Sequence, residues 1–259
     1  MNIVVCIKQV PGTTEIKIDP HTNTLVREGV PSIINPFDCY ALEEAVRLRE
    51  RCGGKVTVIS MGPPQAEEAL RETISLGADE TILLSDRAFA GSDTWTTAYV
   101  LSRAMARIAD YDVIICGRQT LDGDTGQVGP GLSEMLGIPF VAYVSGVDEI
   151  RDGYIRVQRM VEEGYETIEM AIPAVITVVK EINVPRLPSL RGSMKAKTAQ
   201  IPVWSAGDIG VEEDKAGIAG SPTRVVKVFF PRRERKSQML QGSTEELVEQ
   251  LVQKLEGII

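Results

Sequence analysis

Hydrophobic residues in the first half of the chain fall into short runs that are separated by helical patterns. The runs are rich in β-branched residues and carry few charges, which is typical of strands that are buried on both faces of a sheet. They lie at Ile3–Ile7, Lys55–Ser60, Glu80–Leu84 and Asp112–Cys116. The pattern therefore predicts parallel strands at the centre of an α/β domain.

Amphipathic stretches occupy the intervals between these runs. Their apolar residues recur every three or four positions, which predicts helices that pack one face on the sheet. Gly77 suits the left-handed end of one helix, and Ser92 or Asp93 can cap the start of another. The expected helices are Pro36–Cys52, Pro64–Leu76 and Thr94–Ala109. This alternation predicts a mostly parallel, doubly wound sheet with helices on both faces.

The rhythm changes after about Pro139. Tyr154–Met160 and Glu166–Ala171 alternate polar and apolar residues on either side of the turn at Glu162–Tyr165, which predicts a β-hairpin. Ala174–Val179 is again an apolar run and is expected to form another buried strand. The α/β domain is therefore expected to cover residues 1–182, with the hairpin at about 154–171.

The remainder of the chain, residues 183–259, is expected to be an extended arm followed by a helix. Asn183–Gly220 is rich in Pro, Gly, Ser and Lys and has little periodicity, so we expect it to cross a surface rather than form core. Thr244–Leu255 has Leu247, Leu251 and Leu255 on one helical face, and Ser243 or Thr244 can cap it.

Composition narrows the classes of function. The 259 residues carry a net charge of -8, which argues against nucleic-acid binding because that function needs a basic face. A small anionic ligand is still compatible, since backbone N–H groups can bind phosphate. The chain has no run of about 18 apolar residues and no signal peptide, so we expect no membrane span. Its four cysteines form no C-x-x-C pair, which favours reduced thiols and a cytoplasmic location.

Common catalytic motifs are missing from the sequence. The single histidine, His21, lies in a turn-like cluster and is interpreted as a surface residue. The sequence contains neither the P-loop motif nor a strand-linked G-x-G-x-x-G, and no nucleophile–base pair is evident. We therefore expect no catalytic side chain and no metal site, and a hydrolase is a poor fit.

A glycine-rich polar segment follows the strand-like run Asp112–Cys116. It extends to Gly131, and a helix is expected to follow through Leu136. Glycines let a backbone approach a ligand closely, and the Thr125 hydroxyl and the N–H groups at the helix start can hold phosphate oxygens. The segment favours phosphate or nucleotide binding, although glycine-rich loops also occur without a ligand.

Two further loops are predicted at the same edge of the sheet, where ligands of open α/β sheets bind. One is Ser60–Pro63, and the other is Asn35–Asp38 at the start of the first helix. The alternative for Asn35 and Asp38 is a simple helix-capping role. Three loops that converge on one crevice favour a shared ligand.

Taken together, these segments resemble the β subunit of electron transfer flavoproteins, and the resemblance covers nearly the whole chain. Six matches occur in the order that is typical of this family, which makes the resemblance specific. They are V-V-C-I-K-Q-V, N-P-F-D, S-M-G-P-P with S-L-G-A-D, G-R-Q-T-L-D-G-D-T-G-Q-V-G-P, the stretch Val157–Thr177, and M-K-A-K at Met194–Lys197.

The resemblance implies an adenine-nucleotide-binding α/β fold and a larger α subunit that carries an electron-transferring FAD. In this family the crevice of the β subunit holds either AMP, as a structural ligand, or a second FAD. Carried onto this chain, the crevice residues are Cys6, Asn35, Asp38, Ser60, Met61, Cys116, Gly117, Gln119, Asp122, Gly123, Asp124, Thr125, Gly126, Gln127, Val128, Gly129 and Pro130.

The segment D-G-D-T-G-Q-V-G-P resembles the subset of the family that binds a second FAD, takes electrons from NADH and bifurcates them. AMP-binding versions have more carboxylates and a bulkier residue in place of Gly123, whereas glycine leaves room for a flavin. The main alternative is a non-bifurcating subunit with structural AMP. A second alternative is a stand-alone nucleotide-binding protein of the universal-stress type, against which the long C-terminal arm argues.

The segment Pro185–Ile201 resembles the recognition loop with which the family docks acyl-CoA dehydrogenases or other flavin dehydrogenases. The resemblance makes Leu190 the apolar anchor, with Met194, Lys195 and Lys197 beside it. The alternative is an ordinary arm that wraps a partner subunit and has exposed lysines.

Overall fold

The structure is a computed structural model, and it describes residues 1–12, 17–18, 25–26, 32–151, 153–226 and 237–256. Contacts between Cα atoms divide the chain into two compact units, Met1–Val225 and Val226–Ile259. His21, which was interpreted as a surface residue, lies outside the described residues.

The first unit is built on a sheet whose five central strands are parallel. These strands are β1 (Asn2–Ile7), β6 (Lys55–Met61), β7 (Glu80–Leu84), β8 (Val113–Gly117) and β12 (Ala174–Val178). All five were expected from the apolar runs, because a strand that is covered by helices on both faces can have hydrophobic residues at consecutive positions. The predicted parallel α/β sheet is confirmed.

Further strands extend this sheet at both edges. They are β9 (Phe140–Arg151), β10 (Tyr154–Val161), β11 (Gly164–Ala171) and β13 (Val203–Trp204). The sheet has nine strands in the order β11-β10-β9-β12-β8-β1-β6-β7-β13. The hairpin of β10 and β11 is confirmed, whereas β9 was not expected. Its sequence has no clean alternation, and its pairing with both neighbours shifts register.

Short strand pairs lie outside the main sheet. Strand β2 (Gln9–Pro11) pairs with β5 (Ser32–Ile34), and β3 (Lys17–Ile18) pairs with β4 (Leu25–Val26). Both pairs are antiparallel and connect β1 to the first helix of the chain.

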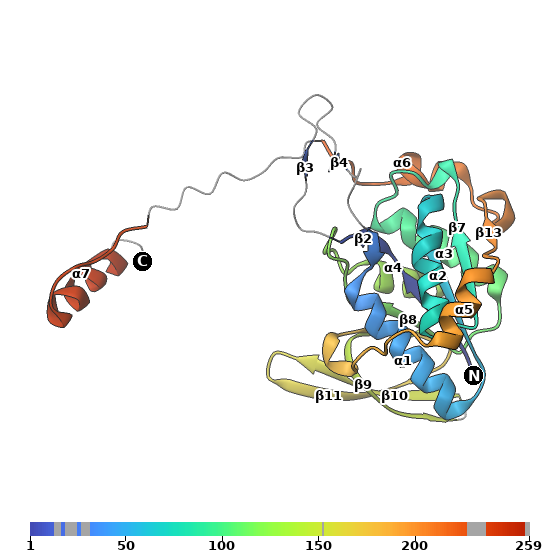
Figure 1. Cartoon of the computed structure of the whole chain (residues 1–259), viewed down its shortest axis with the longest axis horizontal. Coiled ribbons are helices and arrows are strands. Elements are labelled where there is room, and N and C mark those ends of the chain that lie inside the picture. The colour runs from blue at the N-terminus through green and yellow to red at the C-terminus, as the bar shows by residue number, and fades with distance from the viewer. Residues whose placement is uncertain (13–16, 19–24, 27–31, 152, 227–236, 257–259) are drawn as a thin grey trace. The chain divides into compact units, whose positions relative to one another are not determined.

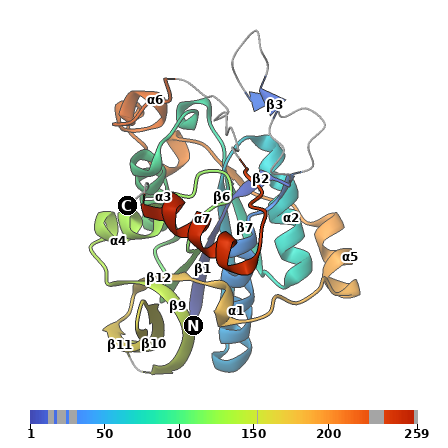
Figure 2. The same ribbon diagram turned by 90° about the vertical axis from the view of Figure 1, so that its left-hand side faces the viewer.

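Helices cover the two faces of the sheet, as Figure 2 shows. They are α1 (Pro36–Cys52) and α2 (Glu67–Leu76) on one face, and α3 (Thr94–Ile108) and α4 (Val128–Leu136) on the other. One-turn helices η1 (Pro64–Ala66) and η2 (Arg87–Phe89) precede α2 and α3. The capping signals are confirmed: Gly77 has φ 119° after α2, and the Asp93 carboxylate accepts a hydrogen bond from Thr96 N at 3.1 Å. The chain therefore turns from sheet to helix where the sequence indicated.

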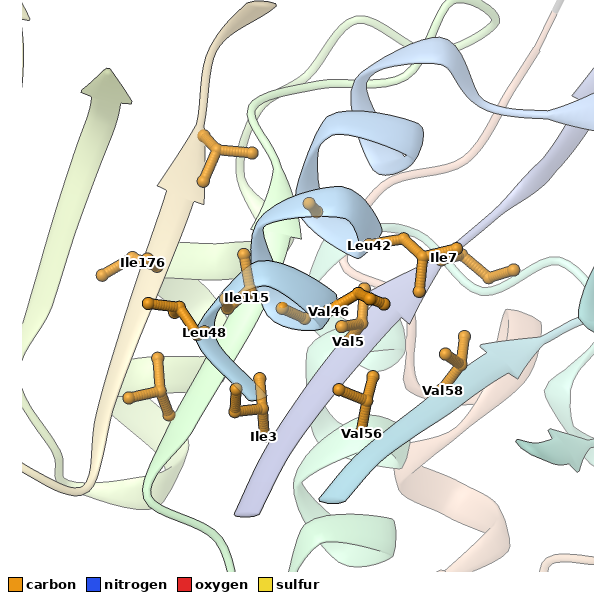
Figure 3. Packing of buried hydrophobic residues seen from close by; sticks show 14 of the residues in the cluster. Ile3, Val5, Ile7, Leu42, Val46, Leu48, Val56, Val58, Ile115 and Ile176 are labelled. Atoms are coloured by element: carbon orange, nitrogen blue, oxygen red, sulfur yellow. The ribbon is translucent and has the colours of Figure 1, made fainter. Parts of the chain in front are cut away.

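The central strands are buried on both faces because their side chains alternate between two hydrophobic clusters. Ile3, Val5 and Ile7 of β1 face α1, whereas Val4 and Cys6 face α3 and α4. The cluster on the α1 face is drawn in Figure 3. Its labelled members are Ile3, Val5, Ile7, Leu42, Val46, Leu48, Val56, Val58, Ile115 and Ile176. This burial fixes the position of the carboxyl ends of the strands.

Residues 183–225 differ from the extended arm that was expected. They form α5 (Leu190–Thr198), β13, and the short helices η4 (Gly207–Ile209), η5 (Glu213–Lys215) and α6 (Gly217–Gly220), after η3 (Lys180–Ile182). Helix α5 lies beside α2 (Figure 1), where the Arg71 guanidinium donates to the carbonyls of Ala196 and Ala199. Such contacts join residues that are far apart in sequence, so periodicity could not reveal them.

The start of this segment is attached to α1 by an arginine. Arg186 Nε lies 2.8 Å from a Glu43 carboxylate oxygen, and Arg186 Nη1 lies 2.7 Å from a Glu50 oxygen. Burial opposes ionisation of Glu43, but the hydrogen bonds from Arg186 outweigh it and lower the pKa of this carboxyl. Asn183 adds a hydrogen bond to the Tyr40 carbonyl at 3.0 Å. The segment is therefore fixed before it reaches α5.

The second unit contains α7 (Thr244–Glu256). Ser243 N donates to the Glu246 carboxylate at 2.7 Å and Glu246 N donates to Ser243 Oγ at 3.4 Å, which is a capping box. Its apolar side chains are about half exposed within the described residues: Val248, Leu251, Val252 and Leu255. Across the described part of the chain, no helix is long and apolar enough to cross a membrane.

We predict that Gly129→Ala destabilises the protein, because a Cβ at this position of α4 would overlap Thr177 Cγ2 of β12. Overpacking of this kind costs about 1–3 kcal/mol of unfolding free energy. Gly146→Ala is the matched control, since its Cβ would have no neighbour nearer than Gln158 Cβ at 3.8 Å. Denaturant unfolding of both variants measures the difference. Equal stability of the two variants would contradict the predicted close contact between α4 and β12.

Candidate functional site

A cavity of ≈ 490 Å³ opens at the carboxyl ends of β1, β6 and β8. It lies where the strand order reverses, because the chain continues from β1 to β6 and β7 on one side and later returns to β8 and β12 on the other. Open α/β sheets bind ligands at this switch point. Its volume is within the range of about 300–1,000 Å³ that is usual for small-molecule sites.

Two buried thiols lie at the strand ends that line the cavity. Cys6 of β1 pairs in register with Cys116 of β8. The hydrogen bond with Cys116 and burial raise the pKa of Cys6 well above its usual value. Cys6 is therefore a neutral thiol.

Asp38 is a fully buried carboxyl at the start of α1, and it also lines the cavity. Burial raises its pKa to about 7, although hydrogen bonds from the Asn35 side chain and from the backbone N–H groups of Lys8 and Gly117 oppose this shift. The bond from Lys8 N is 2.7 Å long. Gly117 is needed beside it, because a Cβ there would overlap Asp38 Oδ1 and the Phe37 backbone.

Asn35 holds the glycine-rich loop in place. It is fully buried, its Nδ2 donates to Gln119 O at 2.8 Å, and its Oδ1 accepts from Leu121 N at 3.2 Å. Asn35 occupies the N-cap position of α1, but its side chain makes no capping hydrogen bond there. The helix-capping alternative for this side chain is therefore wrong.

The acidic residues of the loop are also engaged within the protein. The Asp122 carboxylate lies 2.7 Å from Lys8 Nζ, and the Asp124 carboxylate accepts a hydrogen bond from the Gln119 side chain. Asp124 has φ 52°, a left-handed conformation that aspartate tolerates better than most residues. These contacts pair the loop carboxylates with protein donors, so they fix its shape.

The N-termini of α3 and α4 face the cavity, with Thr94 and Thr97 of α3 and Val128 and Gly129 of α4 in its lining. The N-cap residue of α4, Gln127, makes no side-chain capping bond, so the first N–H groups of α4 are not satisfied by that side chain. Helix N-termini carry partial positive charge and bind anions. This end of the cavity therefore suits phosphate.

A late segment of the first unit completes one wall. The Asp93 carboxylate accepts from Thr223 N at 3.0 Å and from Thr223 Oγ1 at 2.8 Å, while Asp93 N donates to Ser221 Oγ at 2.9 Å. Thr223 thereby reaches the cavity. No local pattern of residues indicated this contact, because residues 93 and 223 meet only in the tertiary structure.

Most residues that were expected in the crevice line this cavity: Cys6, Asp38, Met61, Cys116, Gly117, Gln119, Gly123, Thr125, Gly126, Gln127, Val128 and Gly129. The cavity lining does not include Asn35, Ser60, Asp122, Asp124 or Pro130. Asn35, Asp122 and Asp124 instead form hydrogen bonds or an ion pair that hold the loop in place. Ser60 is buried with no hydrogen-bond partner for its Oγ, and Pro130 is in the first turn of α4.

Other lining residues were not anticipated: Ile7, Lys8, Ser92, Asp93, Thr94, Thr97, Leu101, Arg118, Thr120 and Thr223. The sequence could have predicted the place of Ser92–Thr97 in the lining, because this segment follows a predicted strand and begins a helix at the ligand-binding edge of the sheet. Arg118 and Thr120 lie inside the glycine-rich segment itself.

The residues expected to dock a partner lie outside the cavity lining, on α5. The side chains of Leu190 and Met194 are 82% and 65% exposed, and Lys197 is exposed as well. Lys195 is exposed too, and its Nζ donates to the carbonyls of Ala78 and Asp79 at 3.3 and 3.2 Å. The apolar pair is therefore open to a partner, whereas Lys195 also ties α5 to the end of α2.

Comparisons with known proteins agree with this architecture. A family model described as an electron transfer flavoprotein domain matches residues 22–209. An electron transfer flavoprotein subunit beta from Thermoanaerobacterium thermosaccharolyticum is 53% identical over 256 residues, which covers 98% of each chain. The corresponding subunit of Clostridium acetobutylicum is 46% identical over 255 residues, again 98% of each chain.

A third relative is the CarD subunit of a caffeyl-CoA reductase–Etf complex from Acetobacterium woodii. It is 46% identical over 257 residues, and the match covers 98% of each chain. Identity at this level over nearly the whole length shows common ancestry and a common fold. The chain therefore belongs to the electron transfer flavoprotein family, as a β subunit.

Proposed function

We propose that this chain binds FAD in the cavity at the switch point and is the β subunit of an electron-bifurcating heterodimer. The observation that carries the proposal is the cavity itself, where the starts of α1, α3 and α4 meet beside a loop with glycine at position 123. Family membership makes the chain one subunit of an electron-transferring heterodimer with an α subunit. The proposal adds that the cofactor in the cavity is FAD and that it bifurcates electrons.

The residues present fit a dinucleotide. The N–H groups of Val128 and Gly129 and the Thr125 hydroxyl can hold the diphosphate, because they lie at the lining and carry no negative charge. A Cβ at Gly123 would meet only Thr120 Oγ1, at 3.3 Å, so this side of the cavity is open. That space can admit a flavin ring.

FAD bound here would supply the redox chemistry, as an acceptor of hydride from NADH and a donor of single electrons to two acceptors. The protein binds the cofactor, orients it and adjusts its electronic properties. One acceptor would be the flavin of the α subunit, and the other would be reached through a dehydrogenase that the heterodimer docks.

We place the docking site for an acyl-CoA dehydrogenase or another flavin dehydrogenase at Leu190, Met194 and Lys197. The support is the exposure of this apolar pair on a helix that is fixed to the body of the protein. The relative from the caffeyl-CoA reductase–Etf complex is named for a complex with a CoA-thioester reductase, which fits such a partner. All four cysteines are free, which supports work in the reducing cytoplasm.

A second candidate function is that of a non-bifurcating electron transfer flavoprotein with structural AMP in the same cavity. The anion-binding ends of α3 and α4 suit the phosphate of AMP equally well. The stand-alone universal-stress alternative is not retained, because the matched relatives are β subunits along 98% of their length.

The first test is a cofactor count on the denatured heterodimer of this chain with its α subunit. We expect two FAD and no AMP. Gly123→Leu should remove one FAD and abolish NADH oxidation, because the leucine side chain would extend from a residue that lines the cavity. Gly123→Ala is the control and should keep both flavins. One FAD and one AMP in the unmodified heterodimer would overturn the proposed function in favour of the second candidate.

Thr125→Val tests the phosphate end of the cavity, since it removes a hydroxyl and preserves the shape of the side chain. Losing a hydrogen bond to a charged group typically costs about 1.5–3 kcal/mol, which is roughly a tenfold to hundredfold loss of affinity. We expect faster loss of the β-subunit nucleotide during dialysis, measured by absorbance and chromatography. Unchanged retention would place the phosphates elsewhere.

Leu190→Ala tests docking. We expect unchanged flavin content and unchanged reduction by NADH, but slower electron delivery to the partner dehydrogenase at limiting partner concentration. An apolar anchor can contribute about 2 kcal/mol or more to binding. Val203→Ala, which shortens an apolar side chain that is 51% exposed on β13, is the control. Equal rates for the two variants would show that Leu190 is not the anchor.

A further inference from the structure

Arg118 is the first residue after β8, and its side chain is part of the cavity lining. Its backbone N donates to Val178 O of β12 at 3.0 Å. The main chain is therefore held by both of the strands that end here. Because the backbone is held in this way, the surroundings of the guanidinium decide what Arg118 can bind.

Two aromatic rings flank the guanidinium. Arg118 Cζ lies 5.4 Å from the centroid of the Phe37 ring and 5.2 Å from that of the Tyr143 ring. Phe37 is in the first turn of α1, and Tyr143 has φ 61° in β9, close to the irregular pairing of β9 with β12. Contacts with aromatic faces stabilise a cation and restrict its side chain without neutralising its charge.

The charge of Arg118 has no protein counter-ion among the described residues, and no side-chain hydrogen bond of Arg118 occurs there. Its Nε is buried without a hydrogen-bond partner. The other cation in the lining, Lys8, is paired with Asp122 at 2.7 Å. Of the carboxyls in the lining, Asp93 is occupied by Thr96 and Thr223.

The remaining carboxyl, Asp38, is bonded to the backbone of Lys8, and burial raises its pKa to about 7. Buried polar groups in proteins nearly always have a partner, and those without one commonly bind a ligand or water. The cavity thus holds a positioned guanidinium that no described protein group neutralises. An anionic group of a ligand in the cavity would match this charge.

We propose that Arg118 contacts the isoalloxazine ring of the bound FAD and stabilises its reduced, anionic form. This inference rests on the proposed function. The N–H groups at the starts of α3 and α4 can already bind the phosphates of FAD. Arg118 is therefore available for a second anionic group of the cofactor. The reduced ring carries a negative charge delocalised over N1 and the C2 carbonyl, which a planar guanidinium can match with two N–H groups. A cation beside N1 favours the reduced over the oxidised flavin.

The test compares Arg118→Met, Arg118→Lys and the control Arg87→Met in the purified heterodimer. Arg87 is exposed on η2 and lies outside the cavity lining. The readouts are the two-electron reduction potential of each flavin, the affinity of the flavin-depleted β site for ADP, and thermal unfolding. We expect Arg118→Met to lower the relative affinity for reduced flavin about tenfold, which is about 30 mV for a two-electron couple.

The expected pattern is a lower potential for one flavin, an unchanged potential for the other, and unchanged ADP affinity. Arg118→Lys should give an intermediate shift because it keeps the charge and loses the planar geometry, and Arg87→Met should give none. Weaker ADP binding with an unchanged potential would overturn the ring contact and assign Arg118 to the phosphates. Unchanged potentials together with unchanged ADP affinity would also overturn the ring contact. If the heterodimer still contained two FAD in that case, the proposed function would not be affected. AMP in place of the second FAD would overturn both.

Discussion

The parallel pairing of β1 with β8 is the interaction on which the rest of the structure depends. The two strands run in register from Ile3 opposite Val113 to Cys6 opposite Cys116, and burial on both faces holds them together. The chain leaves β1 toward one side of the sheet and leaves β8 toward the other. Their carboxyl ends therefore diverge into separate loops, and the space between these loops is the cavity.

Polar contacts within the protein fix the shape of this cavity. The Asn35 side chain joins the start of α1 to the glycine-rich loop, because its Nδ2 donates to the loop and its Oδ1 accepts from it. Lys8, directly after β1, forms an ion pair with Asp122 in the same loop. A site that is ordered by its own contacts loses less entropy when its ligand binds. The loop carboxylates are used in this way, so the positive charge in the cavity wall is that of the helix N-termini and of the Arg118 guanidinium.

The cavity and the proposed docking residues lie on different parts of the chain. The cavity is built from strand ends and helix starts, whereas Leu190 and Met194 lie on α5, which Arg71 holds against α2. Arg186 fixes the preceding segment to Glu43 and Glu50 of α1. An exposed apolar pair on a fixed helix can meet a partner without loss of order in the surrounding segment. As a β subunit of an electron transfer flavoprotein, the chain works with an α subunit. In the proposed function, the cavity holds the cofactor and α5 docks a dehydrogenase.

The sequence by itself determined the central strands, the bounds of α1, the start of α7 and the sheet edge at which the cavity opens. Local rules suffice there: apolar runs identify buried strands, and loops at their carboxyl ends converge. The tertiary structure alone decided that β9 joins the sheet despite its irregular pattern, that residues 190–198 form a helix, and that Thr223 reaches the cavity. It also decided that the Asn35 side chain holds a loop. Each of these depends on partners that are distant in sequence, whose hydrogen bonds and burial leave no periodicity in the local pattern of residues.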